Sequence, residues 1–563
     1  MATKKTINKS TEKIGIQLLA RLCRMKGVKH AVVSPGSRNA PLSVAFNRES
    51  GINTTVLVDE RSAGFYALGI AQQTNEPVVV ICTSGTALLN LTPAIAEAYY
   101  QQIPLIVISA DRPQEWIDQD DSQTIRQVNL LDKIVKYSCS MTVESSSESD
   151  IQYNNRIVNE AINISMDESR GPVHINVPLE EPLCGLCEVT SIVPRVISNV
   201  KPKQEIPEEI ASEFAKLINN SLKVMIIASM NKPNEELNSL INKLSSFSQI
   251  TVLTESISNL KGEKLISNID RTLSRMKGQQ IKSCSPDLII SFGGPLISKF
   301  LKKFIRENKP SHHWYIGEQT RVIDTFNSLT QRIESDPVVF FKSVLPFIES
   351  NRSKYAFRWA DLVEKAEKHH LEFVKNLVWS DFKAFSIILP LLPKDSRLQL
   401  SNGTSIRYHQ LFKNNKVNRV DANRGTSGID GSTSTAAGAA SVYKGITTLI
   451  TGDLSFLYDI NALWNKNMSS HLRIIVINNN GGGIFRFIKG PSTLDEMEEY
   501  FEATHSVEIS KLAESYGLNY ISAVNERELK RAMKSIYAWE KPTILEVKTP
   551  RELNDEILRS YFK

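Results

Sequence analysis

The chain has 563 residues, of which 41% are hydrophobic and 23% are charged, and its formal net charge is +6. This composition is typical of folded globular proteins and excludes a largely disordered chain. At roughly 150 residues per domain, the length predicts about three or four domains. The excess of 67 basic over 61 acidic residues is too diffuse to indicate nucleic-acid binding, although it suits a small anionic substrate.

Neither a membrane segment nor a secretory signal is expected. No apolar run reaches the ~18 residues that cross a bilayer, and the basic N-terminal residues precede no apolar stretch. The six cysteines predict no disulfide framework, and the single C-x-x-C of Cys184 and Cys187 has no second pair or histidine cluster to complete a zinc site. These features favour a reducing, cytoplasmic location.

The first region of the chain alternates between predicted helices and short apolar strands. Residues 12–27 place apolar side chains at near-helical spacing, and further helices are expected at 63–71 and 88–100. Such short apolar runs are typical of strands buried on both faces, so the region predicts a parallel, doubly wound sheet. Residues 178–207 are expected to form a linker. The predicted strands are Ala31–Val33, Val56–Val58, Val78–Cys82, Leu105–Ser109 and Val173–Val177.

Two further α/β regions are expected, from about 207 to 350 and from about 380 to 563, with a charged helix at 359–377 before the second of them. Turns rich in Gly, Ser and Asn follow strands in the first and last regions. Ligands of open α/β sheets bind at the carboxyl ends of strands, so these turns are candidate sites. The predicted strands are Val224–Ile227, Thr251–Leu253, Leu288–Ser291, His313–Ile316, Leu398–Leu400, Arg419–Asp421, Thr447–Ile450, Leu472–Ile477 and Thr543–Val547.

The strongest functional pattern combines two turns of the last region. Gly452-Asp453-Leu454-Ser455 and Asn478-Asn479-Asn480-Gly481 each follow an apolar strand, about one strand–helix–strand unit apart. A hard divalent cation binds carboxylate, amide and carbonyl oxygens together with those of a bound phosphate. Asp453, the Asn479 side chain and the Gly481 carbonyl are therefore candidate ligands. The helix after Leu454 is expected to present its N-terminus to the phosphate.

A second pattern places Glu60 at a predicted strand end, before a helix rich in small residues. Alone, such a carboxylate is more often an acid in the first turn of a helix, where it interacts favourably with the helix dipole. Together with the Gly-Asp and Asn motifs, it resembles the thiamine diphosphate enzymes. The resemblance implies thiamine diphosphate, Mg²⁺ (or Mn²⁺), and a homodimer or homotetramer in which the glutamate usually serves a partner subunit's cofactor. It also implies three doubly wound, mainly parallel α/β domains: pyrimidine-binding (1–190), central (205–350) and diphosphate-binding (380–563).

Further motifs narrow the resemblance. They are Ser34-Pro35-Gly36-Ser37-Arg38-Asn39-Ala40-Pro41-Leu42, Thr83-Ser84-Gly85-Thr86-Ala87, Ser109-Ala110-Asp111-Arg112-Pro113, Gln123-Thr124-Ile125-Arg126-Gln127, Asn423-Arg424-Gly425-Thr426-Ser427-Gly428-Ile429-Asp430-Gly431 and Gly483-Ile484-Phe485. The set resembles the 2-succinyl-5-enolpyruvyl-6-hydroxy-3-cyclohexene-1-carboxylate synthases of menaquinone biosynthesis over nearly the whole chain. The resemblance implies a cytoplasmic transferase, a carboligase that decarboxylates 2-oxoglutarate and adds the succinyl-semialdehyde unit to isochorismate.

The resemblance also assigns roles to individual positions. Glu60 matches the glutamate at N1′ of the cofactor, and Ile429 matches the residue that holds the cofactor in its bent form. Asp453, Asn479 and Gly481 match the metal ligands. Other cofactor-lining positions are Ser427, Gly428, Leu454, Ser455, Ile484 and Phe485. The polar and basic substrate pocket is implied at Ser37, Arg38, Arg112, Gln123, Lys299, Arg407 and Arg424, with Ile484, Phe485 and Ile488 as its apolar wall.

Two positions depart from the family pattern. Gly403 stands where the family often has Ser, four residues before Arg407, and Thr404 is the alternative source of a hydroxyl. Ser122 stands where the family often has Asn beside Gln123. The basic pocket is also reasonable on chemical grounds, because both implied substrates are dicarboxylates and arginine binds carboxylates in a bidentate way.

Two alternatives remain. One is another thiamine diphosphate 2-oxoacid decarboxylase or carboligase, although the central region carries no flavin signature of the acetolactate-synthase type. The other is a non-catalytic regulatory protein that binds nucleotides with Rossmann-like domains. The sequence contains neither G-x-x-x-x-G-K-[ST] nor a strand-linked G-x-G-x-x-G, the signatures of such nucleotide sites.

Overall fold

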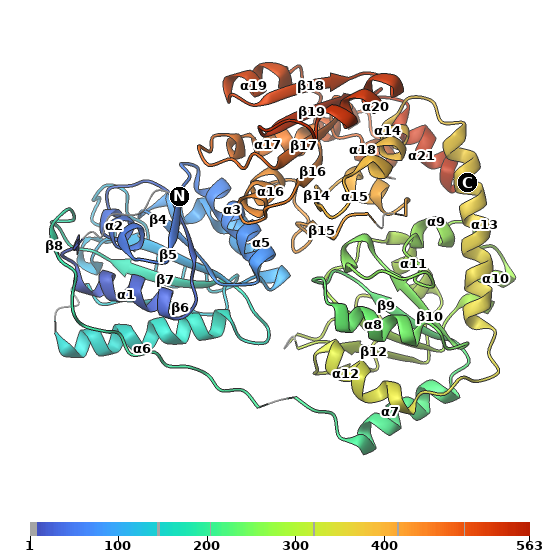
Figure 1. Cartoon of the computed structure of the whole chain (residues 1–563), viewed down its shortest axis with the longest axis horizontal. Coiled ribbons are helices and arrows are strands. Elements are labelled where there is room, and N and C mark those ends of the chain that lie inside the picture. Colours follow the sequence, from blue (N-terminus) through green and yellow to red (C-terminus); the bar gives the residue numbers. More distant parts are fainter. Residues whose placement is uncertain (1–7, 144–146, 203, 319–320, 414–415, 489) are drawn as a thin grey trace. The chain divides into compact units, whose positions relative to one another are not determined.

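The computed structural model describes residues 8–143, 147–202, 204–318, 321–413, 416–488 and 490–563. Its main sheets are two of six strands and one of five, with helices between the strands, and this confirms the α/β class (Figure 1). The chain divides into two compact units. The first unit contains Met1–Lys201, Asn423–Thr447 and Ser455–Leu472, and the second contains Pro202–Ala422, Thr448–Leu454 and Arg473–Lys563.

The sheet of the first unit has the strand order β3-β2-β4-β5-β7-β6, and its neighbouring strands pair in parallel. The order reverses between β2 and β4, so the loops after these strands diverge from a topological switch point, where ligands of such sheets bind. The strands are β2 (His30–Val33), β3 (Asn53–Val56), β4 (Val78–Cys82), β5 (Leu105–Asp111), β6 (Ser138–Ser140) and β7 (Val173–Pro178). The helices are α1 (Ile14–Met25), α2 (Ala40–Arg48), α3 (Glu60–Thr74), α4 (Thr86–Asn90), α5 (Thr92–Gln101) and α6 (Glu148–Ser165).

Three expectations for this region need correction. The strand expected at Val56–Val58 is wrong: β3 ends at Val56, and Val56 and Val58 are exposed because β3 is an edge strand. The helix expected over 88–100 is two helices, because Pro93 has no N–H to continue the ladder, and Thr92 Oγ1 instead donates to Leu89 O (2.6 Å). The expected linker contains β8 (Leu186–Glu188), which pairs antiparallel with β1 (Lys9–Thr11).

The five-stranded sheet of the second unit has the order β10-β9-β11-β12-β13, with neighbouring strands in parallel. Alternate residues of β9 enter different hydrophobic cores: Ile226 packs in one and Ile227 in the other, which explains the uninterrupted apolar runs. The strands are β9 (Val224–Ala228), β10 (Ile250–Thr254), β11 (Leu288–Phe292), β12 (His312–Ile316) and β13 (Gln331–Ile333). The helices are α7 (Glu208–Asn220), α8 (Glu235–Leu244), α9 (Ile269–Leu273), α10 (Gln279–Cys284), α11 (Lys299–Glu307), α12 (Pro337–Val344) and α13 (Tyr355–Lys375).

Figure 1 shows α13 as a long helix that connects this sheet region to α14, where the C-terminal region begins. The C-terminal sheet has the order β15-β14-β16-β17-β19-β18, with its switch point between β14 and β16. The sequence missed β18, because its residues are mostly half-buried and form no apolar run. The strands are β14 (Arg397–Leu400), β15 (Arg419–Ala422), β16 (Thr447–Gly452), β17 (Leu472–Asn478), β18 (Asn519–Ala523) and β19 (Thr543–Lys548). The helices are α14 (Asp381–Ile388), α15 (Thr404–His409), α16 (Ser432–Ser441), α17 (Asp453–Tyr458), α18 (Ile484–Phe487), α19 (Ile509–Ser515), α20 (Glu526–Ser535) and α21 (Asn554–Phe562).

Within the first unit, α16 packs closely against α3. A Cβ atom on Gly69 would lie 2.1 Å from the carbonyl oxygen of Thr435, and one on Gly438 would lie 2.0 Å from that of Tyr66. The two helices therefore meet backbone to backbone at these glycines. This packing fixes α3, which carries Glu60 at its first residue, beside the segment that follows Asn423–Gly431.

Within the described part of the chain, no helix combines the length and the apolar character that a bilayer crossing requires. The six cysteines are free thiols, and Cys184 is exposed.

Candidate active site

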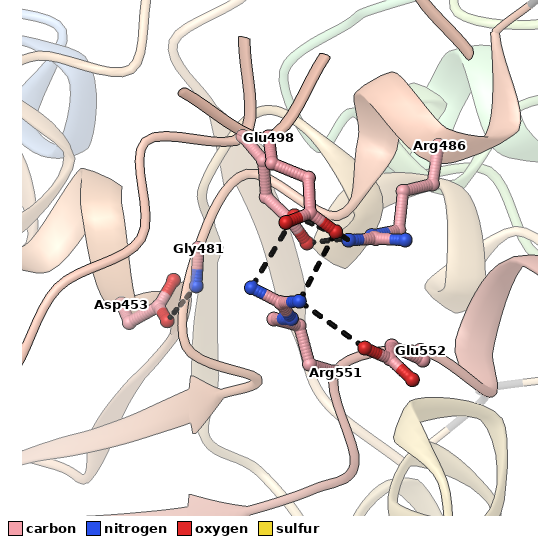
Figure 2. Close-up of polar contacts among 7 residues, drawn as sticks. Asp453, Gly481, Arg486, Glu498, Arg551 and Glu552 are labelled. Atoms are coloured by element: carbon pink, nitrogen blue, oxygen red, sulfur yellow. Dashed lines mark hydrogen bonds and ion pairs between the residues drawn. The ribbon is translucent and has the colours of Figure 1, made fainter. Parts of the chain in front are cut away.

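Asp453 and Gly481 meet at the carboxyl ends of β16 and β17, as their spacing predicts. Asp453 is the first residue of α17 and is buried. Its Oδ2 accepts a hydrogen bond from Gly481 N (2.9 Å, Figure 2), and its Oδ1 accepts one from Leu454 N (2.7 Å). Two backbone N–H groups therefore orient a buried carboxylate beside the loop that follows β17.

Asn479 is oriented by Asp381, a residue that the sequence analysis missed. The Asn479 Nδ2 donates to Asp381 Oδ2 (2.9 Å), and Thr549 Oγ1 donates to the other carboxylate oxygen (2.6 Å). A carboxylate only accepts hydrogen bonds, so the amide nitrogen of Asn479 faces Asp381 and its carbonyl oxygen faces away. Burial raises the pKa of Asp381 to about 6. In the sequence, Asp381 is an ordinary acidic residue directly after Ser380, the N-cap of α14.

His505 is a second residue that the motifs did not include. Its Nε2 lies 3.3 Å from Asp453 Oδ2, and this hydrogen bond raises the pKa of His505. His505 belongs to a loop far along the chain from Asp453, so no spacing pattern indicated it. A cation bound at Asp453 has to share this carboxylate with His505.

This donor set fits a hard divalent cation that is bound together with a phosphate. Among the described residues, no group of three His, Cys, Asp or Glu side chains could hold a metal alone. One carboxylate, one amide oxygen and one backbone carbonyl need further oxygen ligands, which a diphosphate supplies. A Cβ atom on Gly452 would meet nothing within 4 Å, so the backbone before α17 is open to close approach.

Glu60 is the first residue of α3, but it is not the residue that caps this helix. Asp59 does so: its Oδ1 accepts from the backbone N–H groups of Arg61 (2.8 Å) and Ser62 (3.2 Å). Glu60 is half-buried, and its Oε2 receives a long hydrogen bond from Asn90 Nδ2 (3.4 Å). Asp59 therefore provides the cap of α3, and Glu60 is an acidic residue of the first turn whose carboxylate the cap does not require.

The loop Ser427-Gly428-Ile429 exposes apolar surface. Ser427 has a left-handed backbone (φ +65°), and the Ile429 side chain is 42% exposed. Ser455 Oγ donates to the carbonyl oxygen of Ile429 (2.7 Å), which connects this loop to α17 within the first unit. An exposed apolar side chain, on a residue whose backbone carbonyl is fixed by a hydrogen bond, suits the predicted contact with a cofactor ring.

Glu97, on α5, holds the start of the same loop and was also missed. Its carboxylate accepts hydrogen bonds from Gly425 N (2.7 Å), Thr426 N (2.7 Å) and Thr426 Oγ1 (2.6 Å), and its side chain is buried. The sequence gives no signal for this contact, because Glu97 lies on a helix of the N-terminal region. Arg424, immediately before Gly425, is buried as well.

Arg38 and Arg112 lie near each other in the first unit. Desolvation lowers the pKa of the Arg38 guanidinium, and the positive charge of Arg112 adds to this effect. Arg38 donates to Leu179 O (2.9 Å) and pairs with Glu181 (3.1 Å). Arg112 pairs with Asp121 (2.8 Å) and donates to Ser122 O (3.0 Å), so the backbone of Ser122, not its side chain, makes this contact.

Gln123 and Ser37 lie on loops beyond this sheet. Gln123 has a left-handed backbone (φ +59°), and its Nε2 donates to Ser84 O (3.2 Å) in the loop after β4. Ser37 is exposed in the loop after β2. The predicted polar positions therefore follow β2 (Ser37 and Arg38) and β5 (Arg112 and Gln123), and Gln123 contacts the loop after β4.

The remaining basic positions belong to the second unit. Arg407 lies on α15 and donates to the carbonyl oxygen of Gly403. Gly403 has φ +88°, a conformation that favours glycine, and Thr404 begins α15. Lys299 is the exposed first residue of α11.

The apolar wall predicted at Ile484, Phe485 and Ile488 forms α18 and the residue after it. All three side chains are half-buried, and the Phe485 ring packs against Phe501 with ring centroids 5.8 Å apart. These residues follow Gly481 directly, so the same loop carries the predicted metal ligand and the predicted wall.

Three protein-family models match consecutive parts of the chain. Residues 14–130 match a thiamine pyrophosphate enzyme N-terminal TPP binding domain, residues 211–399 match a middle domain of thiamine pyrophosphate enzymes, and residues 402–547 match a thiamine pyrophosphate enzyme C-terminal TPP binding domain. Their order agrees with the three expected regions.

Curated relatives align with nearly the full chain. A protein of Porphyromonas gingivalis is 42% identical over 562 residues, which cover 98% of this chain and 97% of the relative. Relatives from Flavobacterium psychrophilum (42% over 547 residues, 97% of this chain and 98% of the relative) and Bacteroides thetaiotaomicron (36% over 559 residues, 98% and 99%) are also similar. All three are named 2-succinyl-5-enolpyruvyl-6-hydroxy-3-cyclohexene-1-carboxylate synthase.

Proposed function

The chain belongs to the 2-succinyl-5-enolpyruvyl-6-hydroxy-3-cyclohexene-1-carboxylate synthases, a family of thiamine diphosphate enzymes, and on this premise we propose that it joins 2-oxoglutarate to isochorismate with loss of CO₂. This is a step of menaquinone biosynthesis, and the enzyme is a transferase. Family membership argues against a non-catalytic nucleotide-binding protein and favours this reaction over that of another 2-oxoacid decarboxylase.

The observation that carries the proposal is the arrangement of Asp453 with Asn479 and Gly481. Asp453 Oδ2 lies 2.9 Å from Gly481 N, and Asp381 turns the Asn479 carbonyl oxygen away from itself. These residues would hold Mg²⁺ or Mn²⁺ and, through it, the cofactor's diphosphate. In this proposal residues 380–563 bind the diphosphate, 1–190 bind the pyrimidine and 205–350 form the central domain.

Bound thiamine diphosphate supplies the electron sink for decarboxylation of a 2-oxoacid. The chain's own residues would position the cofactor and hold a proton on it. Glu60, relieved of helix capping by Asp59, would hold a proton at N1′ of the aminopyrimidine. Ile429 would support the bent cofactor, and Ser427, Gly428, Leu454, Ser455, Ile484 and Phe485 would line it.

The substrates' four carboxylates would be bound by the basic positions. Arg38 and Arg112 pair with Glu181 and Asp121 within the chain, so a substrate carboxylate has to exchange with these acidic groups. Ser37, Gln123, Lys299 and Arg407 complete the polar pocket, with Phe485 and Ile488 on its apolar side. Thr404 is expected to supply the hydroxyl that a serine often supplies in the family at the position of Gly403.

Arg112 and Arg424 are expected to serve different substrates. We expect Arg424→Ala to raise the half-saturating concentration of 2-oxoglutarate far more than that of isochorismate, and Arg112→Ala to do the reverse. Leaving a carboxylate without its partner typically costs about 2–5 kcal/mol. Steady-state kinetics with each substrate varied in turn measure the effect, and equal weakening of both substrates in both variants would contradict the division. Arg424→Ala should also narrow the preference over pyruvate, which lacks the second carboxylate.

We further propose that the enzyme is at least a homodimer in the cytoplasm, in which each cofactor contacts two chains. Glu60 and Asp453 belong to different compact units of the chain. Mixing Glu60→Gln chains with Asp453→Ala chains should therefore restore part of the activity, because one hybrid site has both native residues. Mixtures that stay inactive, although subunit exchange is demonstrated by mass spectrometry, would indicate a site within one chain.

The experiment that tests the function is a spectrophotometric assay of isochorismate consumption with 2-oxoglutarate and thiamine diphosphate. Consumption of isochorismate should require 2-oxoglutarate, thiamine diphosphate and Mg²⁺, and chelation of the metal should stop it. Equal consumption with pyruvate in place of 2-oxoglutarate would instead indicate a different carboligase.

A further inference from the structure

A buried carboxylate outside every recognised motif contacts the predicted metal loop. Glu502 is the last residue of a π-helical turn, Met497–Glu502, and its side chain is 0% exposed. The backbone carbonyl oxygen of Glu502 accepts a hydrogen bond from Gly482 N (2.6 Å). A Cβ atom on Gly481 would lie 2.9 Å from Glu502 Cγ, so the loop and this side chain are in direct contact.

Two arginines from different elements form ion pairs with the Glu502 carboxylate. Arg486, on α18, donates with Nε to Oε1 (2.7 Å) and with Nη2 to Oε2 (2.6 Å), a bidentate pair. Arg551, beyond the end of β19, places Nη1 3.9 Å from Oε2. Both arginines also contact Glu498, at 2.9 Å and 3.2 Å, but the Glu498 side chain is 58% exposed (Figure 2).

The cluster of Glu502, Arg486 and Arg551 therefore joins the loop after β17 to α18 and to the segment after β19. Arg486 lies between Phe485 and Ile488, so the element that holds Glu502 also carries the predicted apolar wall. Gly481 supplies a backbone carbonyl whose position depends on the loop alone, since no side chain can adjust it. A metal ligand of this kind requires support from its neighbours.

We propose that Glu502, held by Arg486 and Arg551, is a positioning residue that sets the Gly481 carbonyl for the metal ion. The inference rests on the proposed function, because it assumes that the metal binds at Asp453, Asn479 and Gly481. Glu502 does not touch the reacting atoms in this account. Its effect is on the metal, through the backbone of Gly481 and Gly482.

The test compares two variants with the same chemical change. Glu502→Gln keeps the size of the side chain but removes the charge beside both arginines. Glu498→Gln removes a charge from the same two arginines at an exposed position that does not contact Gly481, and exposed ion pairs contribute little. Calorimetric titration of thiamine diphosphate at a series of Mg²⁺ concentrations, repeated with Mn²⁺, gives the half-saturating metal concentration for each protein.

We expect Glu502→Gln to raise the half-saturating metal concentration by ~10–100-fold, the range typical for loss of a residue that supports a metal ligand. Glu498→Gln should change it by less than about threefold. An unchanged value for Glu502→Gln, or equal increases in both variants, would overturn the proposal. If Glu502→Gln does not fold, Arg486→Lys, which keeps the charge but loses the bidentate contact, replaces it with the same expected increase, and no increase overturns the proposal.

The wild-type titration separates this inference from the function on which it rests. If the wild-type protein shows no metal-dependent binding of thiamine diphosphate, the proposed function fails and the inference fails with it. If the wild type binds normally and only the comparison of variants fails, the metal site stands and Glu502 has a purely structural role. Thermal unfolding without ligand checks that each variant is folded.

Discussion

Asp453→Ala is expected to abolish tight binding of thiamine diphosphate. Asp453 is the only carboxylate among the three predicted metal ligands, and it is buried with both oxygens oriented by backbone N–H groups. Without it, a divalent cation would have only neutral protein ligands to offset the charge of the diphosphate. Affinity should fall by more than ~100-fold, beyond the effect of losing a residue that merely supports a ligand.

Equilibrium titration at limiting Mg²⁺ measures this loss. The matched control is Asp132→Ala, which removes an exposed aspartate of the N-terminal region and should leave the affinity unchanged. Near-normal affinity in Asp453→Ala would remove Asp453 from the ligand set. Excess Mg²⁺ should restore part of the binding if Asn479 and Gly481 still contribute.

Glu60→Gln is expected to leave the fold and most of the cofactor affinity intact but to reduce turnover by about 100-fold or more, a typical contribution of general acid–base catalysis. Glutamine can still form a hydrogen bond at N1′, but it cannot hold the proton there. The helix start should survive, because Asp59 provides the cap.

Hydrogen–deuterium exchange at the cofactor's C2 position reports on this role separately from substrate binding. Exchange should be slow in Glu60→Gln and normal in Glu115→Gln, which changes an exposed glutamate of the same region. Exchange at the wild-type rate in Glu60→Gln would mean that Glu60 is not the proton partner.

The sheets were predictable where burial acts on both faces of a strand. β4, β5 and β9 are buried at every position, so their apolar runs marked them in the sequence. β3 and β18 lie at sheet edges, where most of their residues are half-buried or exposed, so neither strand has a continuous apolar run in the sequence. The division of α4 from α5 depends on Pro93, which interrupts the helix although the apolar pattern continues across it.

The turns that carry the candidate site were predictable for a different reason. Asp453 and Asn479 follow neighbouring strands of a parallel sheet, and the carboxyl ends of such strands meet at one edge. Asp381 and Glu97 were not predictable, because each contacts its loop from an element remote in the chain. Glu502 is nearer in the chain, but it lies in a π-helical turn that no motif indicated. Their sequence surroundings are those of ordinary helical acids, and only the tertiary structure shows that their carboxylates orient the loops.

The central claim is that one site couples decarboxylation of 2-oxoglutarate to consumption of isochorismate. The most direct measurement follows CO₂ release from 2-oxoglutarate and isochorismate loss in the same reaction, with thiamine diphosphate and Mg²⁺ present. The account predicts that the two proceed in equal amounts and that both stop in Asp453→Ala. Release of CO₂ at an undiminished rate without isochorismate, or loss of isochorismate without 2-oxoglutarate, would contradict it.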